Sequence, residues 1–146
     1  MIMVGHAYYP ELQGGEPQPA TLSRTIVTDL LRTRMGYDGV ILTDDLEMGA
    51  VDQRLSPGEV ALRALEAGND LVMYCKSWDR VEEAHEAIVR SLDGDPRNRS
   101  RIDESLSRVF LLKERLPSLE KAPEFSLARF AGVCESLARL EGDARG

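Results

Sequence analysis

The sequence has 146 residues, of which 42% are apolar and 29% charged, and its net charge is −7. This length allows one domain with a buried core and excludes two large ones. An acidic chain with no run of five Lys or Arg is a poor partner for nucleic acid or anionic membranes. No apolar run approaches the roughly 20 residues of a membrane-spanning helix, and the first residues do not read as a signal peptide. We therefore expect a soluble, cytoplasmic protein.

Two cysteines, Cys75 and Cys134, stand far apart in the sequence. This number and spacing give neither a disulfide framework nor a metal-binding cysteine cluster. Both cysteines follow apolar patterns, so we expect both in the core.

Three short apolar runs predict strands, and a helical pattern follows each of them. The runs lie at residues 2–7, 40–43 and 71–75. They are continuous rather than alternating, which is typical of strands buried on both faces of a parallel sheet. The repeated strand-then-helix order predicts an α/β fold.

Helix boundaries are marked by capping residues. Ser56, Pro57 and Glu59 form a start signal, with Ser as N-cap, Pro at the first helical position and Glu at the third, and Gly68 ends that helix. Further helices are expected over residues 22–31 with Gly36 at the end, after Ser77, after Ser100, and over residues 127–138, with a linker at 117–123 and a polar tail from Glu141.

Polar residues follow each predicted strand, where parallel α/β sheets gather their functional groups. They are His6, the cluster of Asp44, Asp45 and Glu47, and Lys76. Burying a carboxylate at the end of a strand costs free energy unless its charge is compensated or has a function. A role as a nucleophile or as a metal ligand would explain that cost. Capping of the next turn by Asp45 or Glu47 explains it equally well. A histidine at such a position is more often a pocket wall than a catalyst, and a lysine more often solvated.

Several segments, in this order, resemble the catalytic domain of glycoside hydrolase family 3, within it the bacterial β-N-acetylglucosaminidase (β-hexosaminidase) branch. The resemblance extends over residues 1–116, and residues 117–146 do not share it. The segments are residues 19–24 (PATLSR), 30–32 (LLR), 36–50 (GYDGVILTDDLEMGA), 64–72 (ALEAGNDLV) and 101–105 (RIDES).

The resemblance implies the C-terminal part of a (β/α)8 TIM barrel, about strands six to eight with their helices. Residues 1–116 would form this partial barrel domain, and residues 117–146 a linker, a C-terminal helix and a polar tail. A complete barrel takes about 250 residues, so the resemblance implies a truncated chain.

The resemblance also implies a reaction. These retaining enzymes remove a terminal, non-reducing β-linked N-acetylglucosamine through a covalent glycosyl-enzyme, here from peptidoglycan turnover products in the cytoplasm. The family nucleophile falls on Asp44, and His6 and Met48 fall on the substrate pocket. No metal or organic cofactor is expected, because the mechanism needs only a carboxylate and an acid/base group about 5 Å away.

The family carries its acid/base, a His paired with an Asp, and its main sugar-binding residues upstream of the segments found here. We therefore expect this chain to be inactive alone. Its expected partners are a carbohydrate and the missing N-terminal part of the barrel, unless it self-associates through the open edges of its sheet.

A non-enzymatic interpretation stays open beside this one. A small α/β module could use Asp44, Asp45 and Glu47 to hold Mg²⁺ or a partner chain, since carboxylates are the ligands that this cation prefers.

Overall fold

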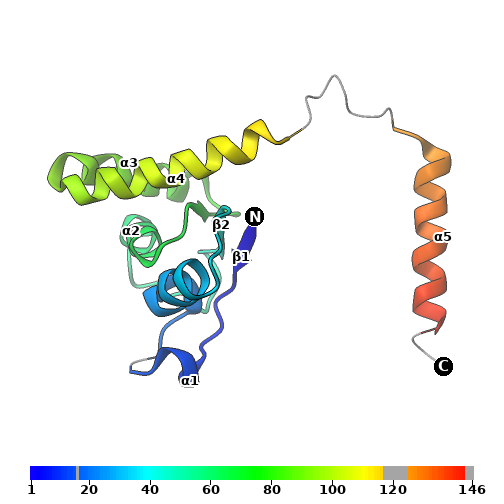
Figure 1. The fold of residues 1–146 in the computed structure, drawn as a ribbon, viewed down its shortest axis with the longest axis horizontal. Helices are drawn as coiled ribbons and strands as arrows, with labels where there is room; N and C mark the ends of the chain where they lie inside the picture. The colour runs from blue at the N-terminus through cyan, green and yellow to red at the C-terminus, as the bar shows by residue number, and fades with distance from the viewer. Residues whose placement is uncertain (16, 117–124, 144–146) are drawn as a thin grey trace. The chain divides into compact units, whose positions relative to one another are not determined.

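The computed structural model describes residues 1–15, 17–116 and 125–143, in two compact units, Met1–Arg115 and Leu116–Gly146. The second unit contains the helix α5 (Leu127–Asp143), which continues past Glu141, where we expected a polar tail (Figure 1). The linker expected at residues 117–123 lies outside the described residues. Within the described ranges, no helix combines the length and the apolar character needed to cross a membrane.

The first unit is built on a parallel sheet of three strands, which confirms the α/β expectation. The strands are β1 (Ile2–Val4), β2 (Ile41–Asp45) and β3 (Leu71–Met73), in the order β1-β2-β3. Ile2 pairs with Ile41, and Leu42 pairs with Leu71. The carboxyl end of the central strand β2, with Asp44 and Asp45, therefore lies in the middle of the sheet edge.

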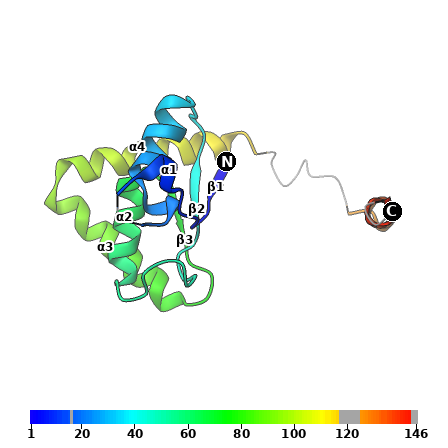
Figure 2. The same cartoon turned by 90° about the horizontal axis from the view of Figure 1, so that it is seen from below.

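Helices gather on one side of this sheet in both views (Figures 1 and 2). A short helix α1, not expected from the sequence, lies in the loop after β1. The elements are α1 (Pro10–Gln13), η1 (Ala20–Leu22), the π-helix η2 (Thr25–Arg34), α2 (Pro57–Ala67), α3 (Trp78–Gly94) and α4 (Pro96–Glu114).

Burial along β2 alternates with the pleat of the strand. Ile41, Thr43 and Asp45 are buried on the helix-covered face, whereas Leu42 and Asp44 are only half-buried. The expectation that both faces are buried is therefore wrong for these strands, because helices pack against one face only. We call the other face, which carries Leu42 and Asp44, the open face.

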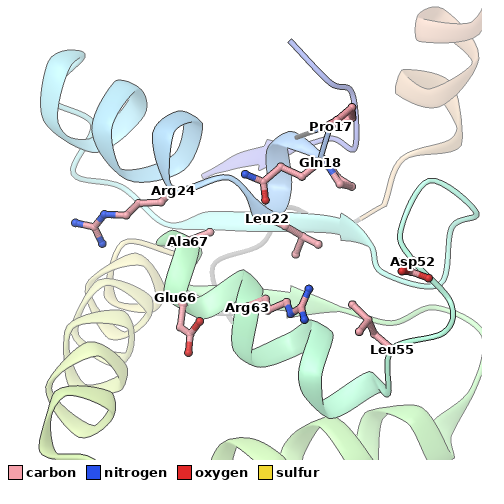
Figure 3. A pocket seen from close by; sticks show the side chains of 10 residues that line it. Pro17, Gln18, Leu22, Arg24, Asp52, Leu55, Arg63, Glu66 and Ala67 are labelled. Carbon is pink, nitrogen blue, oxygen red and sulfur yellow. The ribbon is translucent and has the colours of Figure 1, made fainter. Parts of the chain in front are cut away.

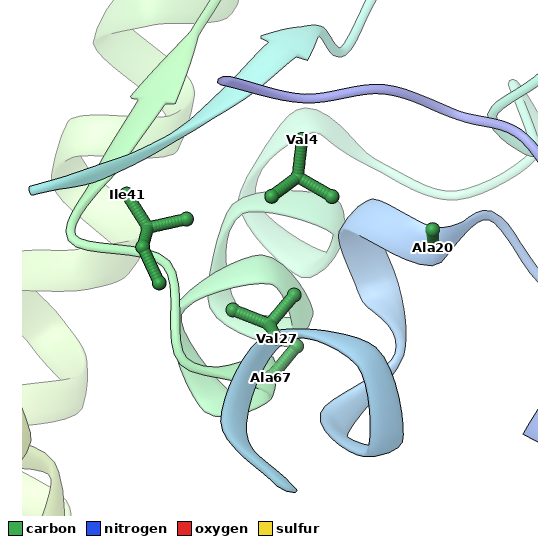
Figure 4. Packing of buried hydrophobic residues seen from close by; sticks show 5 residues of the cluster. All are labelled: Val4, Ala20, Val27, Ile41 and Ala67. Atoms are coloured by element: carbon green, nitrogen blue, oxygen red, sulfur yellow. The ribbon is translucent and has the colours of Figure 1, made fainter. Parts of the chain in front are cut away.

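The helix-covered face packs into a small apolar core. One cluster joins the sheet to η1, η2 and α2, so it fixes the helices against the strands (Figure 4). Its buried residues are Val4, Ala20, Val27, Ile41 and Ala67.

The capping box expected at the start of α2 is confirmed. The Ser56 hydroxyl accepts a hydrogen bond from the Glu59 N–H (3.2 Å), and the Glu59 carboxylate accepts one from the Ser56 N–H (2.9 Å). The helix ends at Gly68, whose φ of +118° favours glycine.

Two helix starts differ from expectation. The helix predicted from Leu22 begins at Thr25, because Leu22 belongs to the separate turn η1. The helix α4 begins at Pro96 rather than after Ser100. Asp95 is its N-cap and accepts a hydrogen bond from the Arg97 N–H (2.8 Å), so an Asp-Pro pair starts the helix earlier.

Both cysteines are exposed, which corrects the expectation that they belong to the core. The strand β3 ends at Met73, so Cys75 lies in the loop beyond it. Cys134 lies on an exposed face of α5.

Candidate active site

Asp44 lies near the carboxyl end of the central strand, on the open face. One of its carboxylate oxygens accepts a hydrogen bond from the Asp45 N–H (2.8 Å). Within the described part of the chain, no partner is found for its other oxygen. A half-buried carboxylate held at one oxygen and free at the other, on a rigid strand, suits attack on a substrate.

Asp45 points to the helix-covered face and is 8% exposed. Its Oδ1 accepts hydrogen bonds from the Glu47 N–H (3.0 Å) and the Cys75 N–H (3.3 Å). These contacts close the turn after β2 and join it to the loop after β3. For Asp45, the structure supports the interpretation as a turn-capping residue.

Glu47 caps the helix α3. Its Oε2 accepts hydrogen bonds from the Lys76 N–H (2.6 Å) and the Ser77 N–H (3.3 Å), and its Oε1 lies 3.7 Å from the Arg80 Nε. Ser77, expected to cap this helix, is the N-cap residue but makes no hydrogen bond through its side chain. A carboxylate at the positive end of a helix is favourable, which compensates the burial of Glu47.

These contacts weaken the Mg²⁺ interpretation. Glu47 uses one carboxylate oxygen on backbone N–H groups and the other faces Arg80, and Asp45 uses its Oδ1 on two N–H groups. Among the described residues, Asp44 and Asp45 therefore keep one oxygen each without a partner. The described residues contain no group of three or more His, Cys, Asp or Glu placed to hold a metal ion.

His6 reaches the same turn from β1. Its Nε2 lies 2.9 Å from the backbone carbonyl oxygen of Asp45, and its buried Nδ1 has no partner among the described residues. A carbonyl only accepts, so the Nε2 of His6 must carry the proton and donate it. The structure thus brings His6 and the turn after Asp44 together, as their positions at the ends of parallel strands predicted.

Met48 and Lys76 lie at the rim of this edge and are exposed. The Met48 N–H donates to the Asp45 carbonyl (3.0 Å), and the Lys76 ammonium donates to the Glu47 carbonyl (3.3 Å). The Met48 backbone and the Lys76 side chain are therefore held at the rim, while the Met48 side chain is exposed and can contact a ligand.

The Cys75 thiol is not prepared as a nucleophile. Removal from solvent and the nearby charges of Asp45, Glu47 and Asp44 raise the pKa of this thiol. The reactive form of cysteine is the thiolate, which this environment disfavours.

A hollow of about 550 Å³ lies elsewhere, between α2 and the segment before η2 (Figure 3). Leu22 and Leu55 line it together with charged residues of α2, Arg63 and Glu66. Neither His6 nor any of residues 44–48 lines it, so it is separate from the candidate site.

Sequence reasoning missed one link between the strands. Buried Thr43 accepts a hydrogen bond through its hydroxyl from the Met73 N–H (3.0 Å). This bond bridges the irregular pairing between β2 and β3 just before Asp44. A threonine within an apolar run reads as an ordinary strand residue, so the sequence carries no signal for this contact.

Relatives with solved structures share this fold. A glycoside hydrolase family 3 β-N-acetylglucosaminidase from Paenibacillus sp. str. FPU-7 matches with a TM-score of 0.69 and 35% identity, over 86% of this chain and 24% of that one. A β-N-acetylhexosaminidase from Beutenbergia cavernae matches with a TM-score of 0.67 and 36% identity, over 77% of this chain and 32% of that one.

Curated relatives are also named β-hexosaminidases. The β-hexosaminidase LpqI of Mycobacterium tuberculosis is 36% identical over 118 residues, which are 77% of this chain and 29% of that protein. β-Hexosaminidase A of Pseudoalteromonas piscicida is 30% identical over 132 residues, or 80% of this chain and 22% of that protein. The chain thus spans less than a third of the length of either relative.

The family to which the chain belongs is shown by a match to a family model over most of its residues. Residues 1–112 match the model described as the glycosyl hydrolase family 3 N terminal domain. This range contains all three strands, the turn after β2 and His6. The chain belongs to glycosyl hydrolase family 3.

Proposed function

We propose that this chain forms the C-terminal part of the catalytic domain of a retaining β-N-acetylhexosaminidase, with Asp44 as its nucleophile. The observation that carries the proposal is the placement of Asp44 on the open face at the end of the central strand, with one oxygen free. Asp45 is buried on the opposite face and Glu47 is held by the loop before α3, so Asp44 is the carboxylate of the three that lies on the open face.

The arrangement of the sheet supports a partial barrel as the setting of this reaction. Helices cover one face of three parallel strands, and β1 and β3 each have one paired edge. In a (β/α)8 barrel the helices form the outer ring and the other face of the strands lines the interior. Asp44 on the open face would then point into the barrel mouth, and the remaining strands would come from outside the chain described here.

The proposed reaction has two steps at Asp44. In the first, the free oxygen of Asp44 forms a bond to the anomeric carbon while the bond to the leaving-group oxygen breaks and that oxygen takes a proton from an acid/base group. In the second, a water molecule returns a proton to the acid/base group and its oxygen bonds to the anomeric carbon while the bond to Asp44 breaks, with net retention of configuration. The Asp45 N–H, which donates to the other oxygen, orients the carboxylate in both steps. In this proposal the acid/base group comes from outside the residues described here.

The proposed substrate is a terminal, non-reducing β-linked N-acetylglucosamine, taken from peptidoglycan turnover products in the cytoplasm. The β-hexosaminidase names of the relatives support the sugar. His6 and Met48 would line the pocket beside the nucleophile, since both contact the Asp45 carbonyl.

A chimera tests Asp44. Residues 1–112 of this chain would replace the matching segment of the Beutenbergia cavernae enzyme, so that the rest of a domain is supplied. We expect the chimera to hydrolyse 4-nitrophenyl N-acetyl-β-glucosaminide, and Asp44→Asn to lower kcat roughly 10³-fold or more. The isolated chain should not turn over this substrate.

The control is Asp52→Asn, which changes an exposed carboxylate paired with Arg54 and should leave kcat unchanged. Turnover that survives in a folded Asp44→Asn chimera would exclude this nucleophile. A mechanism-based glycosyl fluoride that labels another residue, as read by mass spectrometry, would do the same.

A further inference from the structure

Trp78 is the single tryptophan of the chain and is 72% exposed at the first position of α3. Its indole N–H donates to a carboxylate oxygen of Glu82, one helical turn later (2.9 Å). This bond holds the ring in one orientation while its apolar surface stays in contact with solvent. A large apolar ring fixed at the surface is typical of a residue that binds a partner.

Trp78 lies at the start of the helix that follows β3, at the same end of the strands as Asp44. The loop that precedes it, residues 74–77, follows β3, and its Lys76 and Ser77 N–H groups bind the Glu47 carboxylate. Glu47 in turn lies three residues after Asp44. The loop that leads into Trp78 is therefore fixed to the turn that follows Asp44.

We propose that Trp78 is a stacking platform for the saccharide on the leaving-group side of the bond that is broken. This inference rests on the proposed function. The C–H face of a pyranose ring is apolar and packs on an indole, while its hydroxyl groups remain in water. The terminal sugar must contact Asp44 itself, so a ring at the start of α3, beside the turn that follows Asp44, receives the next sugar. Because Glu82 already orients the ring, little freedom is lost on binding.

Fluorescence of the single tryptophan tests the platform directly in this chain. We expect N,N′-diacetylchitobiose to cause a saturable blue shift of the Trp78 emission and to protect the ring from quenching by acrylamide. Sorbitol, which has no pyranose face, should do neither. An emission that does not change with the disaccharide, or that changes equally with sorbitol, overturns the proposal.

A matched pair of variants tests the role of the fixed ring. Glu82→Ala removes the partner of the indole N–H and should raise the Kd for the disaccharide about two- to tenfold, because the ring must then be ordered on binding. Glu86→Ala, on the same helix, removes a partner of Arg90 instead and should leave the Kd unchanged. Equal Kd values in the two variants would contradict the proposal.

The chimera separates failure of the platform from failure of Asp44. Trp78→Ala should lower kcat/KM for N,N′-diacetylchitobiose about tenfold and leave N-acetyl-β-glucosaminyl fluoride unaffected, because fluoride offers nothing to stack. Equal losses on both substrates overturn the platform and leave the nucleophile intact. Asp44→Asn should abolish turnover of both substrates while the fluorescence response persists.

Discussion

At the scale of single residues, the strands have two ends with different roles. Asp70 precedes β3 at the end opposite Asp44, and its side chain is fully buried. It accepts a hydrogen bond from the Ile41 N–H (2.9 Å), which joins two strands. Its carboxylate also contacts three arginines and a serine from η2 and α4, namely Arg32, Arg101, Arg108 and Ser105. This end stabilises the fold, whereas the end with Asp44 is available for chemistry.

Replacement of Asp70 should be strongly destabilising. Asp70→Asn leaves three arginines around a neutral group, and loss of one partner in a buried ionic cluster costs about 3–5 kcal/mol. Urea unfolding followed by circular dichroism would measure this loss. Asp52→Asn, in an exposed pair with Arg54, should leave the midpoint nearly unchanged. Similar midpoints for both variants would contradict the importance assigned to Asp70.

The partly buried Tyr74 predicts that the stability of the fold depends on pH. Burial raises the pKa of Tyr74 to about 12, and its hydroxyl donates to the Pro57 carbonyl (2.6 Å). Above its usual pKa of 10.0, the unfolded chain loses this proton before the folded one does. Stability should therefore fall as the pH rises from about 10 to about 12.

Urea unfolding at about pH 9 and about pH 11 measures this dependence for the native chain and for Tyr74→Phe. The phenylalanine variant should lose the part of the decrease that Tyr74 contributes. An identical decrease in both proteins would show that other groups are responsible.

At the scale of elements, two serines hold the same N-cap position with different contacts. The Ser56 hydroxyl completes a capping box on α2, whereas the Ser77 side chain makes no capping bond at α3, where Glu47 accepts a hydrogen bond from the Ser77 N–H instead. We expect Ser56→Ala to cost about 1 kcal/mol and Ser77→Ala to have little effect. Urea midpoints of the two variants compare them, and equal losses would contradict this division of roles.

The elements themselves could largely be predicted from local signals. Apolar runs located the three strands, and Ser56 with Glu59 located α2. The start of α4 was misplaced because Asp95 and Ser100 are both acceptable caps, and the sequence does not say which one the chain uses. The capping of α3 by Glu47 could not be predicted, since it joins residues thirty positions apart.

At the scale of the whole molecule, the sheet of the first unit ends in two strands that each have one neighbour. Met3 on β1 is 53% exposed on the open face, next to an edge whose backbone can pair with another strand. Such edges promote association unless a charge or a covering element blocks them.

We therefore expect the isolated chain to self-associate at micromolar concentration, as sedimentation velocity would show. Met3→Lys places a charge on the edge strand and should shift the chain toward monomer. Met35→Lys, at an exposed methionine after η2 and away from the sheet edges, should not. A native chain that sediments as a monomer would rule out association through the edges.

The sequence by itself determined the family, the three strands and the position of the acidic cluster, because these are local patterns of apolar runs, caps and motif residues. Only the tertiary structure decided which carboxylate of the cluster lies on the open face of the sheet. The strand pleat turns Asp44 and Asp45 to opposite faces, and N–H groups from the distant loop after β3 occupy Asp45 and Glu47. The sequence also could not show that the helices cover only one face of the sheet. A continuous apolar strand indicates that both of its faces are buried, but not which segments bury them.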